Sequence, residues 1–415
     1  MRDTFLPFSA PLIGEDEISE VVDTLRSDWI TTGPKVKRFE QDFAQFVHAP
    51  DALAVSSGTA ALHLALLALG IGKGDAVITS PMTFCSGVHV IEHVGAMPIL
   101  CDVEPDTLNL DPKGIGEQIA KAEKDLGLRV KAIMPVHLHG HPCDRDAILR
   151  IAAEHQLAVI EDAAHSLPAA YKNRSIGSLS AADGVPVLTC FSFYATKNLT
   201  TAEGGMLTGP SGLLDEARRW TLHGMSRDAW NRYNAKGSWL YDVTCPGFKY
   251  NMTDIAAALG LQQLKKLPQS YCRRRAIVQQ YHSAFSSREE LELPAERNEV
   301  QHAWHLYVVR LNLDRTNITR DEFIDEMQER NIGCSVHFIP VHLLSYYRDK
   351  YRYQPEQFPV ALGEYQRIVS LPLSARMTDN DVKDVIDTVI SILHENKLTK
   401  SITIERTASA DVISV

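Results

Sequence analysis

Apolar and polar residues follow one another along the chain in two patterns, which predict two kinds of element. Short apolar runs are typical of buried strands, and longer segments with apolar residues at helical spacing are typical of amphipathic helices. This alternation predicts a mostly parallel sheet with helices on both faces. Strands are predicted at Ala52–Val55, Ala76–Thr79, Met97–Cys101, Val130–Val136, Ala158–Ile160, Val185–Phe193 and Met206–Thr208, and helices at Thr59–Leu69, Thr83–Val94, Pro112–Glu123, Asp144–His155 and Leu213–Leu222.

Two further helices are predicted before the first strand. A Thr-Thr-Gly-Pro turn at 31–34 separates them, because glycine and proline interrupt regular structure. The first helix spans Glu15–Ser27, and the second begins after the turn. Each has one apolar face, formed in the first by Ile18, Val21, Val22 and Leu25 and in the second by Phe39, Phe43 and Phe46.

The C-terminal part of the chain has a different pattern. A helix is predicted to begin at Thr253, and a long helix at Gln269–Phe285 leads away from the sheet. We expect a large domain at residues 14–265, a small α+β domain at 266–396 and a loose tail at 397–415, which lacks helical periodicity. The small domain is predicted to hold strands at Trp304–Leu311 and Gly333–His337 and helices at Arg320–Arg330 and Asp379–His394.

Length and composition narrow the class of protein. A chain of 415 residues is long enough for two domains, and its 45% hydrophobic and 23% charged residues are ordinary for a globular protein. The net charge of −10 argues against a nucleic-acid partner. Seven cysteines without CxxC spacing suit a reducing compartment. No run approaches the ~20 apolar residues of a membrane span, and no signal peptide precedes the first helix, so we expect a soluble, cytoplasmic protein.

Three predicted strands end in residues that together suit one cofactor. The strand at 52–55 leads into Ser-Gly-Thr, the strand at 158–160 into Asp162, and the run 185–193 into a loop with Lys197. Open α/β sheets bind ligands at the carboxyl ends of their strands. Pyridoxal phosphate needs an amine for its aldehyde, an acid beside its pyridine nitrogen and backbone N–H groups for its phosphate. We therefore predict pyridoxal phosphate as cofactor and Lys197 as the catalytic residue, although a lone lysine is more often a surface charge.

The residues around the phosphate and the ring each have a second interpretation. Gly58 and Thr59 open a helix whose N–H groups can face an anion, but Ser-Gly-Thr alone also suits a plain helix cap. Phe84, which follows the next strand, can stack on the cofactor ring or belong to the core.

The acid beside the pyridine nitrogen is predicted to be Asp162. Its neighbour Glu161 would point to the opposite side of a strand. His165 follows three residues after Asp162. We expect it beside the ring or its 3-oxygen, with a histidine at a helix cap as the alternative.

His137, His139, His141 and Cys143 suggest a metal site, because alternate residues of a strand share one face. A glycine and a proline between them interrupt the strand, so this is the weaker hypothesis and no metal is predicted.

Two further residues are candidates for substrate binding. The stretch 218–247 is irregular and rich in arginine and aromatic residues, which suit a nucleotide-sugar or carboxylate pocket. Arg227 is our candidate there, with surface ion pairing as the alternative. His337 is placed near the substrate, with a packing role as the alternative.

The motifs that carry these residues resemble one known family. They run in the family's order from Phe5 to about Leu373, nearly the whole chain. The sequence resembles the DegT-type (DegT/DnrJ/StrS) sugar aminotransferases, which use pyridoxal phosphate and have the aspartate aminotransferase type I fold. The matching segments are FLPFSAPLIGEDEI, WITTGPKVKRFE, SSGTAALHLAL, PVHLHGHPCD, IEDAAHS, FSFYATKNLTTAEGG, KYNMTDIAAALGLQQL, HAWHLYVV and VHFIPVHL.

The resemblance implies further roles for single residues. It implies that the Ser192 hydroxyl reaches the phosphate, that Phe84 stacks on the ring and that the loop with Thr32 borders the sugar site. It also implies that Asn251 reaches the phosphate of the neighbouring subunit, which would make the protein a homodimer with shared active sites. FLPFS, WITTGPK and HAWHL most resemble enzymes that aminate C4 of a UDP-4-keto-pentose, but Tyr194 and Phe84 stand where that branch has histidine and tryptophan.

The predicted reaction moves the amino group of L-glutamate to the 4-keto group of a nucleotide-linked sugar and releases 2-oxoglutarate. One site serves both halves of the reaction, which predicts ping-pong kinetics. Amino-sugar, lipopolysaccharide, O-antigen and lipid A pathways all fit such a product. The alternatives are a cyclitol or other keto-sugar aminotransferase, a pyridoxal phosphate-dependent sugar dehydratase, which the presence of Lys197 disfavours, and a cofactor-free sensor.

Overall fold

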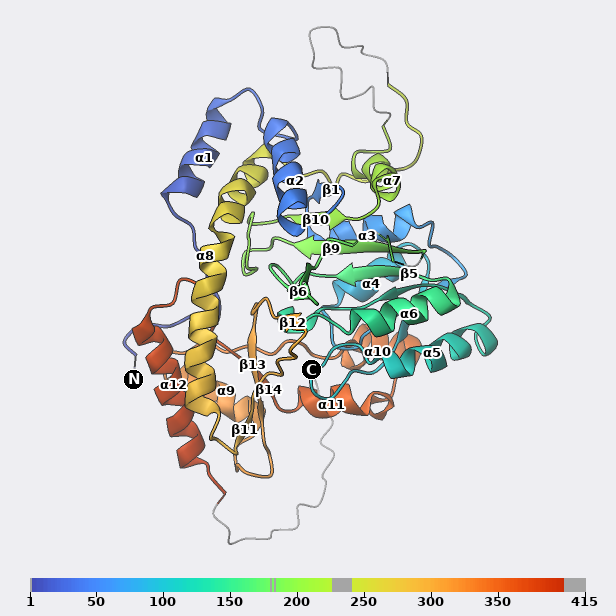
Figure 1. Cartoon of the computed structure of the whole chain (residues 1–415). Helices are drawn as coiled ribbons and strands as arrows, with labels where there is room; N and C mark the ends of the chain where they lie inside the picture. The colour runs from blue at the N-terminus through green and yellow to red at the C-terminus, as the bar shows by residue number, and fades with distance from the viewer. Residues whose placement is uncertain (1, 180, 183, 226–240, 399–415) are drawn as a thin grey trace.

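The computed structural model describes residues 2–398, apart from 180, 183 and 226–240 (Figure 1). Within these residues, the central sheet has eight strands in the order β1-β10-β9-β5-β4-β2-β3, and β8 pairs with β9 beside this path. All neighbours from β9 to β3 are parallel, so the sheet is mostly parallel, as predicted. At the other end, β10 runs antiparallel to both β1 and β9, and β8 runs antiparallel to β9. The strands are β1 (Ala52–Val55), β2 (Asp75–Thr79), β3 (Met97–Leu100), β4 (Arg129–Met134), β5 (Ala158–Asp162), β8 (Ala181–Ala182), β9 (Val185–Ser192) and β10 (Gly205–Thr208).

Helices cover both faces of this sheet because successive strand residues point to opposite sides. In β2, Val77 packs into the cluster formed with α3, α4 and α7, whereas Ala76 and Ile78 pack with α5 and α6. The predicted two-faced α/β layer is therefore confirmed. The five helices are α3 (Gly58–Ala68), α4 (Ser86–His93), α5 (Pro112–Lys124), α6 (Arg145–His155) and α7 (Ser211–Thr221).

A long helix, α8 (Asp254–Phe285), connects the sheet to the C-terminal part of the chain (Figure 1). The helices α1 (Glu15–Arg26) and α2 (Pro34–Val47) pack against α8, and α12 (Asp379–Glu395) packs nearer its C-terminal end. A second sheet, β11-β13-β14, lies in a separate hydrophobic cluster with α9 and α12. The other elements are β6 (Ala170–Tyr171), β7 (Arg174–Ser175), β11 (Leu291–Glu292), β12 (Val300–Gln301), β13 (Tyr307–Leu311), β14 (Ile368–Leu371), α9 (Arg320–Glu329), α10 (Ser345–Tyr351) and α11 (Pro359–Tyr365).

Two predicted elements of the C-terminal part are wrong. The helix expected to start at Gln269 is the second half of α8, which continues through Pro268. The strand expected at Gly333–His337 does not form. Its place beside β13 is taken by β14, and the 333–337 segment makes only an isolated bridge, from Ser335 to Ser370. The domain boundaries at 265 and 396 stay predictions.

The segment before α1 packs against the C-terminal part, and α1 leaves apolar side chains exposed. Leu6 pairs with Ile332, and the N–H of Leu373 donates to the Phe8 carbonyl, so the segment before α1 lies against the C-terminal part. In α1, Ile18 is 49% exposed and Leu25 is 58% exposed, whereas Val21 and Val22 are partly buried, so this chain covers the predicted apolar face only in part. Among the described residues, every helix is too short or too polar to cross a membrane.

Candidate active site

Lys197 lies in the loop between β9 and β10, where the sequence predicted it. The loop folds back because the Lys197 N–H donates to the Tyr194 carbonyl at 2.9 Å and the Thr201 N–H donates to the Phe193 carbonyl at 2.9 Å. Burial lowers the pKa of the Lys197 amine to about 8, although the charge of Asp162 works in the opposite direction. An amine with this pKa is partly uncharged near neutral pH, which a nucleophile requires.

Glu161 and Asp162, adjacent at the end of β5, point to different surroundings. Glu161 accepts from Arg145 Nε at 2.6 Å and from Thr189 Oγ1 at 2.7 Å. Burial favours the neutral form, but the charge of Arg145 and these hydrogen bonds hold the Glu161 pKa at about 2. Asp162 accepts from the Ala164 N–H at 3.0 Å, and burial raises its pKa while the charge of Lys197 opposes the shift. Asp162 is therefore the carboxylate that interacts with the amine.

The first turn of α3 has backbone N–H groups that could bind an anion. Ser57 caps the helix by accepting from the Ala60 N–H at 3.0 Å. The N–H groups of Gly58 and Thr59 have no acceptor among the described residues. A Cβ atom added to Gly58 would lie 2.8 Å from Cβ of Ser192, so the end of β9 borders the same turn. Free helix N–H groups beside a serine hydroxyl suit a phosphate.

His165 and Phe84 lie on the border of this region. His165 is buried, and its Nδ1 accepts from the backbone N–H of His139 at 3.2 Å. Its ring stacks on Phe338 at 5.7 Å, and Phe338 in turn lies 6.0 Å from the Phe84 ring. Phe84 is 60% exposed, so it does not belong to the hydrophobic core in this chain. An exposed aromatic ring at this position is available for stacking.

His337 lies in the same part of the molecule. The His139 Nε2–H donates to the His337 carbonyl at 2.9 Å, and His337 Nδ1 lies 2.8 Å from Ser370 Oγ. Burial, with the charges of His139 and Lys197, lowers the His337 pKa to about 3. The structure thus brings His337 near Lys197 as a neutral imidazole.

The other histidines of the PVHLHGHPCD segment make separate hydrogen bonds. The interruption of the strand that Gly140 predicted is confirmed, because residues 138–140 form a 3-10 turn. His137 Nδ1 accepts from the Cys143 N–H at 3.1 Å, and His141 Nδ1 donates to the Pro142 carbonyl at 2.8 Å. Gly140 is required in this turn, because it has φ +103° and a Cβ there would lie 2.9 Å from the His165 carbonyl oxygen. Within the described ranges, no group of three such side chains could hold a metal.

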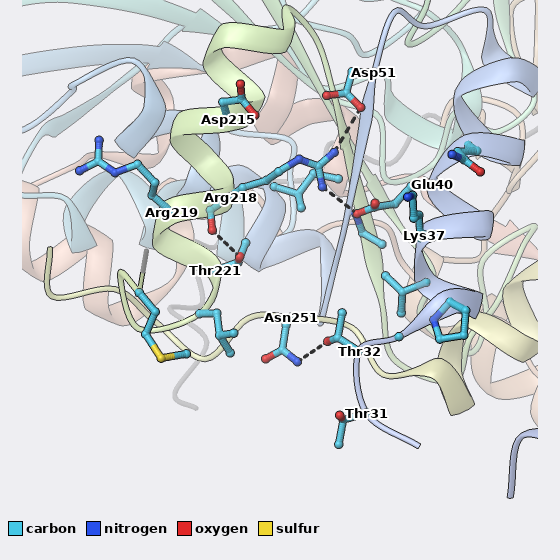
Figure 2. A pocket seen from close by; sticks show the side chains of 18 of the residues that line it. Thr31, Thr32, Lys37, Glu40, Asp51, Asp215, Arg218, Arg219, Thr221 and Asn251 are labelled. Carbon is cyan, nitrogen blue, oxygen red and sulfur yellow. Dashed lines mark hydrogen bonds and ion pairs between the residues drawn. The ribbon is translucent and has the colours of Figure 1, made fainter. Parts of the chain in front are cut away.

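Thr32 and Asn251 lie elsewhere, in a broad cavity of about 1950 Å³. Asn251 Nδ2 donates to Thr32 Oγ1 at 2.7 Å (Figure 2). Thr32 Oγ1 in turn donates to the Met252 carbonyl. The residues that line this cavity include neither Lys197 nor Asp162. The structure therefore does not place this pair against the chain's own amine. Arg227 lies outside the described residues.

Three residues around the Lys197 loop were not predicted. Asn198, next to Lys197, bonds to the Ala303 carbonyl and to His305 in the segment before β13. Arg274 on α8 donates to the His305 carbonyl. The sequence contained two signals for these residues. Asn198 is adjacent to Lys197, and His305 belongs to the HAWHL motif that supports the family resemblance.

Comparison with known proteins places the chain in a family. The DegT/DnrJ/EryC1/StrS aminotransferase family matches residues 11–390. The spore coat polysaccharide biosynthesis protein SpsC of Bacillus subtilis is 50% identical over 394 residues, which are 94% of this chain and 98% of SpsC. The chain therefore belongs to the DegT/DnrJ/EryC1/StrS aminotransferase family, and the predicted family and enzyme class are confirmed.

Solved structures support the same assignment. Spr1654 from Streptococcus pneumoniae, described as a sugar aminotransferase, is 35% identical in its PMP form, with a TM-score of 0.85 over 94% of this chain and 99% of Spr1654. It is also known in a PLP form. DesV from S. venezuelae, in complex with a ketimine intermediate, is 29% identical, with a TM-score of 0.81 over 94% of this chain and 99% of DesV. The predicted fold class is confirmed, and pyridoxal phosphate is confirmed as the cofactor at the level of the family.

Proposed function

We propose that this protein is a pyridoxal phosphate-dependent aminotransferase that moves the amino group of L-glutamate to the 4-keto group of a nucleotide-linked sugar. The observation that carries the proposal is that Asp162 and the loop of Lys197 follow the carboxyl ends of the parallel neighbours β5 and β9, where the charge of each group shifts the pKa of the other. The first turn of α3, beside Ser192, adds the third part that the cofactor requires.

The residues present fit pyridoxal phosphate. The free N–H groups of Gly58 and Thr59, with the hydroxyl of Ser192, would hold its phosphate. Phe84 would stack on one face of the ring, and His165 would lie beside the ring or its 3-oxygen. When bound, the cofactor supplies an electron sink for the carbanion formed during amino transfer.

Asp162 and Lys197 have distinct tasks in this reaction. The carboxylate of Asp162 would keep a proton on the pyridine nitrogen, and that positive charge would return the carboxyl pKa toward the ionised state. Lys197 would hold the cofactor at rest. After the amino donor displaces it, its amine would move a proton between the donor's α-carbon and the cofactor. A pKa of about 8 suits an amine that must both accept and release a proton near neutral pH.

The relatives support a sugar as the amino acceptor. SpsC takes its description from polysaccharide biosynthesis, and Spr1654 is described as a sugar aminotransferase. A ketone on a sugar is the group that an aminotransferase converts to an amine. The nucleotide, the donor L-glutamate and a role in amino-sugar, lipopolysaccharide or O-antigen synthesis are parts of the proposal. Arg227 and His337 are the proposed contacts to the acceptor, and Thr32 borders the sugar site.

The active sites are proposed to be shared within a homodimer. Asn251 and Thr32 are hydrogen-bonded to each other in a cavity whose lining residues do not include Lys197 of the same chain. The exposed apolar side chains of Ile18 and Leu25 on α1 need a cover that this chain does not supply. A second copy of the chain would cover this surface. Asn251 of one subunit would then contact the cofactor phosphate in the active site of the other subunit.

A panel of amino acceptors tests the substrate class. The enzyme loaded with pyridoxal phosphate would be given L-glutamate with a UDP-4-keto-pentose, a dTDP-4-keto-6-deoxyhexose or a nucleotide-free ketocyclitol, and 2-oxoglutarate would be measured. Turnover of a nucleotide sugar, with parallel double-reciprocal lines, is the expected result. Turnover of the ketocyclitol alone would contradict the nucleotide-sugar assignment, and loss of a sugar hydroxyl without amination would indicate a dehydratase.

A further inference from the structure

Asn198, next to Lys197, has its amide orientation fixed by the protein. Its Nδ2 donates to the carbonyls of Leu167 at 2.8 Å and Ala303 at 2.9 Å. Both partners are acceptors, so the nitrogen of the amide must face them. The oxygen, Oδ1, therefore faces the remaining partner, His305 Nδ1, at 3.3 Å.

This contact fixes the tautomer of His305. An amide oxygen only accepts hydrogen bonds, so the proton of the neutral imidazole lies on Nδ1 and Nε2 has a lone pair. Burial lowers the His305 pKa well below its usual value, and the charges of Lys197 and Arg274 lower it further. Nε2 of His305 has no hydrogen-bond partner among the described residues. It is nevertheless absent from the buried side-chain atoms that lack a partner, so this atom keeps some accessible surface. It therefore borders space that another group can enter.

His165 has the opposite tautomer. Its Nδ1 accepts from the His139 N–H at 3.2 Å, so the proton of neutral His165 lies on Nε2. The two imidazole rings have centroids only 4.4 Å apart. The positive charge of Lys197 is the main cause, after burial, of the lowered pKa of both rings. One hydrogen-bond donor and one acceptor thus lie side by side close to the Lys197 amine.

Arg274 holds the backbone of His305 from α8. Its Nη1 donates to the carbonyls of Trp304, His305 and Leu373, each at 3.1 Å. The guanidinium is buried, and no carboxylate in the described chain pairs with it. This permanent charge disfavours a second positive charge on His305, so the imidazole keeps its free lone pair.

We propose that Asn198 is a positioning residue that fixes His305 as the Nδ1–H tautomer, and that Nε2 of His305 accepts a hydrogen bond from the ammonium group of Lys197 when that group is not bonded to the cofactor. The inference rests on the proposed function, in which the amine of Lys197 is released in each half of the reaction. His165 cannot take this role, because its Nε2 carries a hydrogen. Asp162 would be engaged by the pyridine nitrogen. The charge of Lys197 also lowers the pKa of His337, but the Nδ1 of this imidazole interacts with Ser370 Oγ.

The tautomers are tested directly by ¹⁵N NMR of histidine rings in the cofactor-free protein, with His305 assigned from the spectrum of His305→Asn. The proposal requires a protonated Nδ1 and a bare Nε2 on His305. In Asn198→Ala, the signals of His305 should move toward those of the other tautomer. A proton on Nε2 of His305 in the unchanged protein would overturn the proposal.

The hydrogen bond to Lys197 is tested by the pKa of its amine, read from ¹³Cε signals that Lys197→Arg assigns. In His305→Asn, the amide nitrogen takes the place of Nδ1 and keeps the bond to Asn198, but no atom replaces Nε2. The ammonium then loses an acceptor, and the Lys197 pKa should fall by about one unit. The matched control is His302→Asn, because His302 accepts from the Trp304 N–H through Nδ1 and an amide oxygen can replace that atom. The control should leave the pKa unchanged.

An unchanged Lys197 pKa in His305→Asn would overturn the proposal. If that variant does not fold, Asn198→Ala gives the same test. Without Asn198 the His305 proton can move to Nε2, which then cannot accept a hydrogen bond from the ammonium, so the Lys197 pKa should again fall. The tautomer measurements use cofactor-free protein. The Lys197 pKa is measured in protein loaded with pyridoxamine phosphate, in which the amine is free and Asp162 would face the pyridine nitrogen. A protein that does not take up this cofactor would overturn the proposed function instead, so the two failures are distinct.

Discussion

A Cβ atom added to Gly58 would lie 2.8 Å from Cβ of Ser192, so the first turn of α3 and the end of β9 touch where only glycine fits. This contact brings the free N–H groups of the helix and the serine hydroxyl to one place. It explains why a small residue opens the helix at this point, since the backbone itself must approach the anion.

The contact predicts that Gly58→Ala weakens the binding of pyridoxal phosphate. The added methyl group must push α3 away from β9, and overpacking of this kind typically costs about 1–3 kcal/mol. We expect an affinity about tenfold lower or worse in an absorbance titration. Gly116→Ala in α5 is the matched control, because a Cβ there meets nothing within 4 Å. Equal affinities of the two variants would show that the α3 turn does not hold the phosphate.

Asp162→Asn should reduce kcat by about a hundredfold with little loss of stability. The amide cannot keep a proton on the pyridine nitrogen, so the electron sink weakens, as when other electrostatic partners of a transition state are removed. The measurement is a single-turnover rate with L-glutamate in the loaded enzyme. A variant with the unchanged rate would assign the acid role to another group.

Glu161→Gln should instead affect stability. The substitution leaves the buried Arg145 without its carboxylate, and breaking such a pair typically costs about 3–5 kcal/mol. Urea unfolding at pH 7 measures this loss, with the exposed Glu123→Gln as control.

The effect of Glu161 should also depend on pH. Its folded pKa of about 2 lies below its usual value of 4.5, so the charged form stabilises the fold above pH 4.5. This contribution is lost as the pH falls through about 2. The difference between the original protein and Glu161→Gln should therefore shrink between pH 4.5 and pH 2. A difference that grows in this range would contradict the assignment of the pair.

Shared active sites predict complementation between two inactive variants. Lys197→Ala lacks the amine, and Asn251→Ala lacks the residue that a partner would donate. A mixed dimer would contain one site with both residues intact, so mixing the two variants after mild dissociation should restore activity above that of either alone. Absence of any gain, with mixed dimers demonstrated by mass spectrometry, would place Asn251 in its own chain's site or outside the site.

Much of the site could be predicted because its residues follow strand ends. Asp162 ends β5 and Ser192 ends β9, two parallel neighbours in the sheet, so the pattern of apolar runs placed them at one edge. Successive side chains of a strand point to opposite faces of the sheet, so the sequence also predicted that Glu161 points away from Asp162.

The remaining features depend on contacts that no local pattern contains. Asn198 and His305 are 107 positions apart, and only the fold brings them together. The sequence predicted that Gly140 interrupts the strand, but not the close approach of the His165 carbonyl that requires a glycine, because that approach is a tertiary contact. The exposure of Ile18 could not be predicted for a related reason. The sequence of an apolar helix face indicates that the face is buried, but not whether the same chain or a second chain buries it.

Lys197 is proposed to hold pyridoxal phosphate and to release it to an amino donor. The visible absorbance of the purified, cofactor-loaded protein, measured before and after addition of L-glutamate, tests this role, with Lys197→Ala as control. We expect a yellow band that bleaches with glutamate and is absent from the variant. A colourless protein that pyridoxal phosphate cannot reconstitute, or the same band in Lys197→Ala, would contradict it.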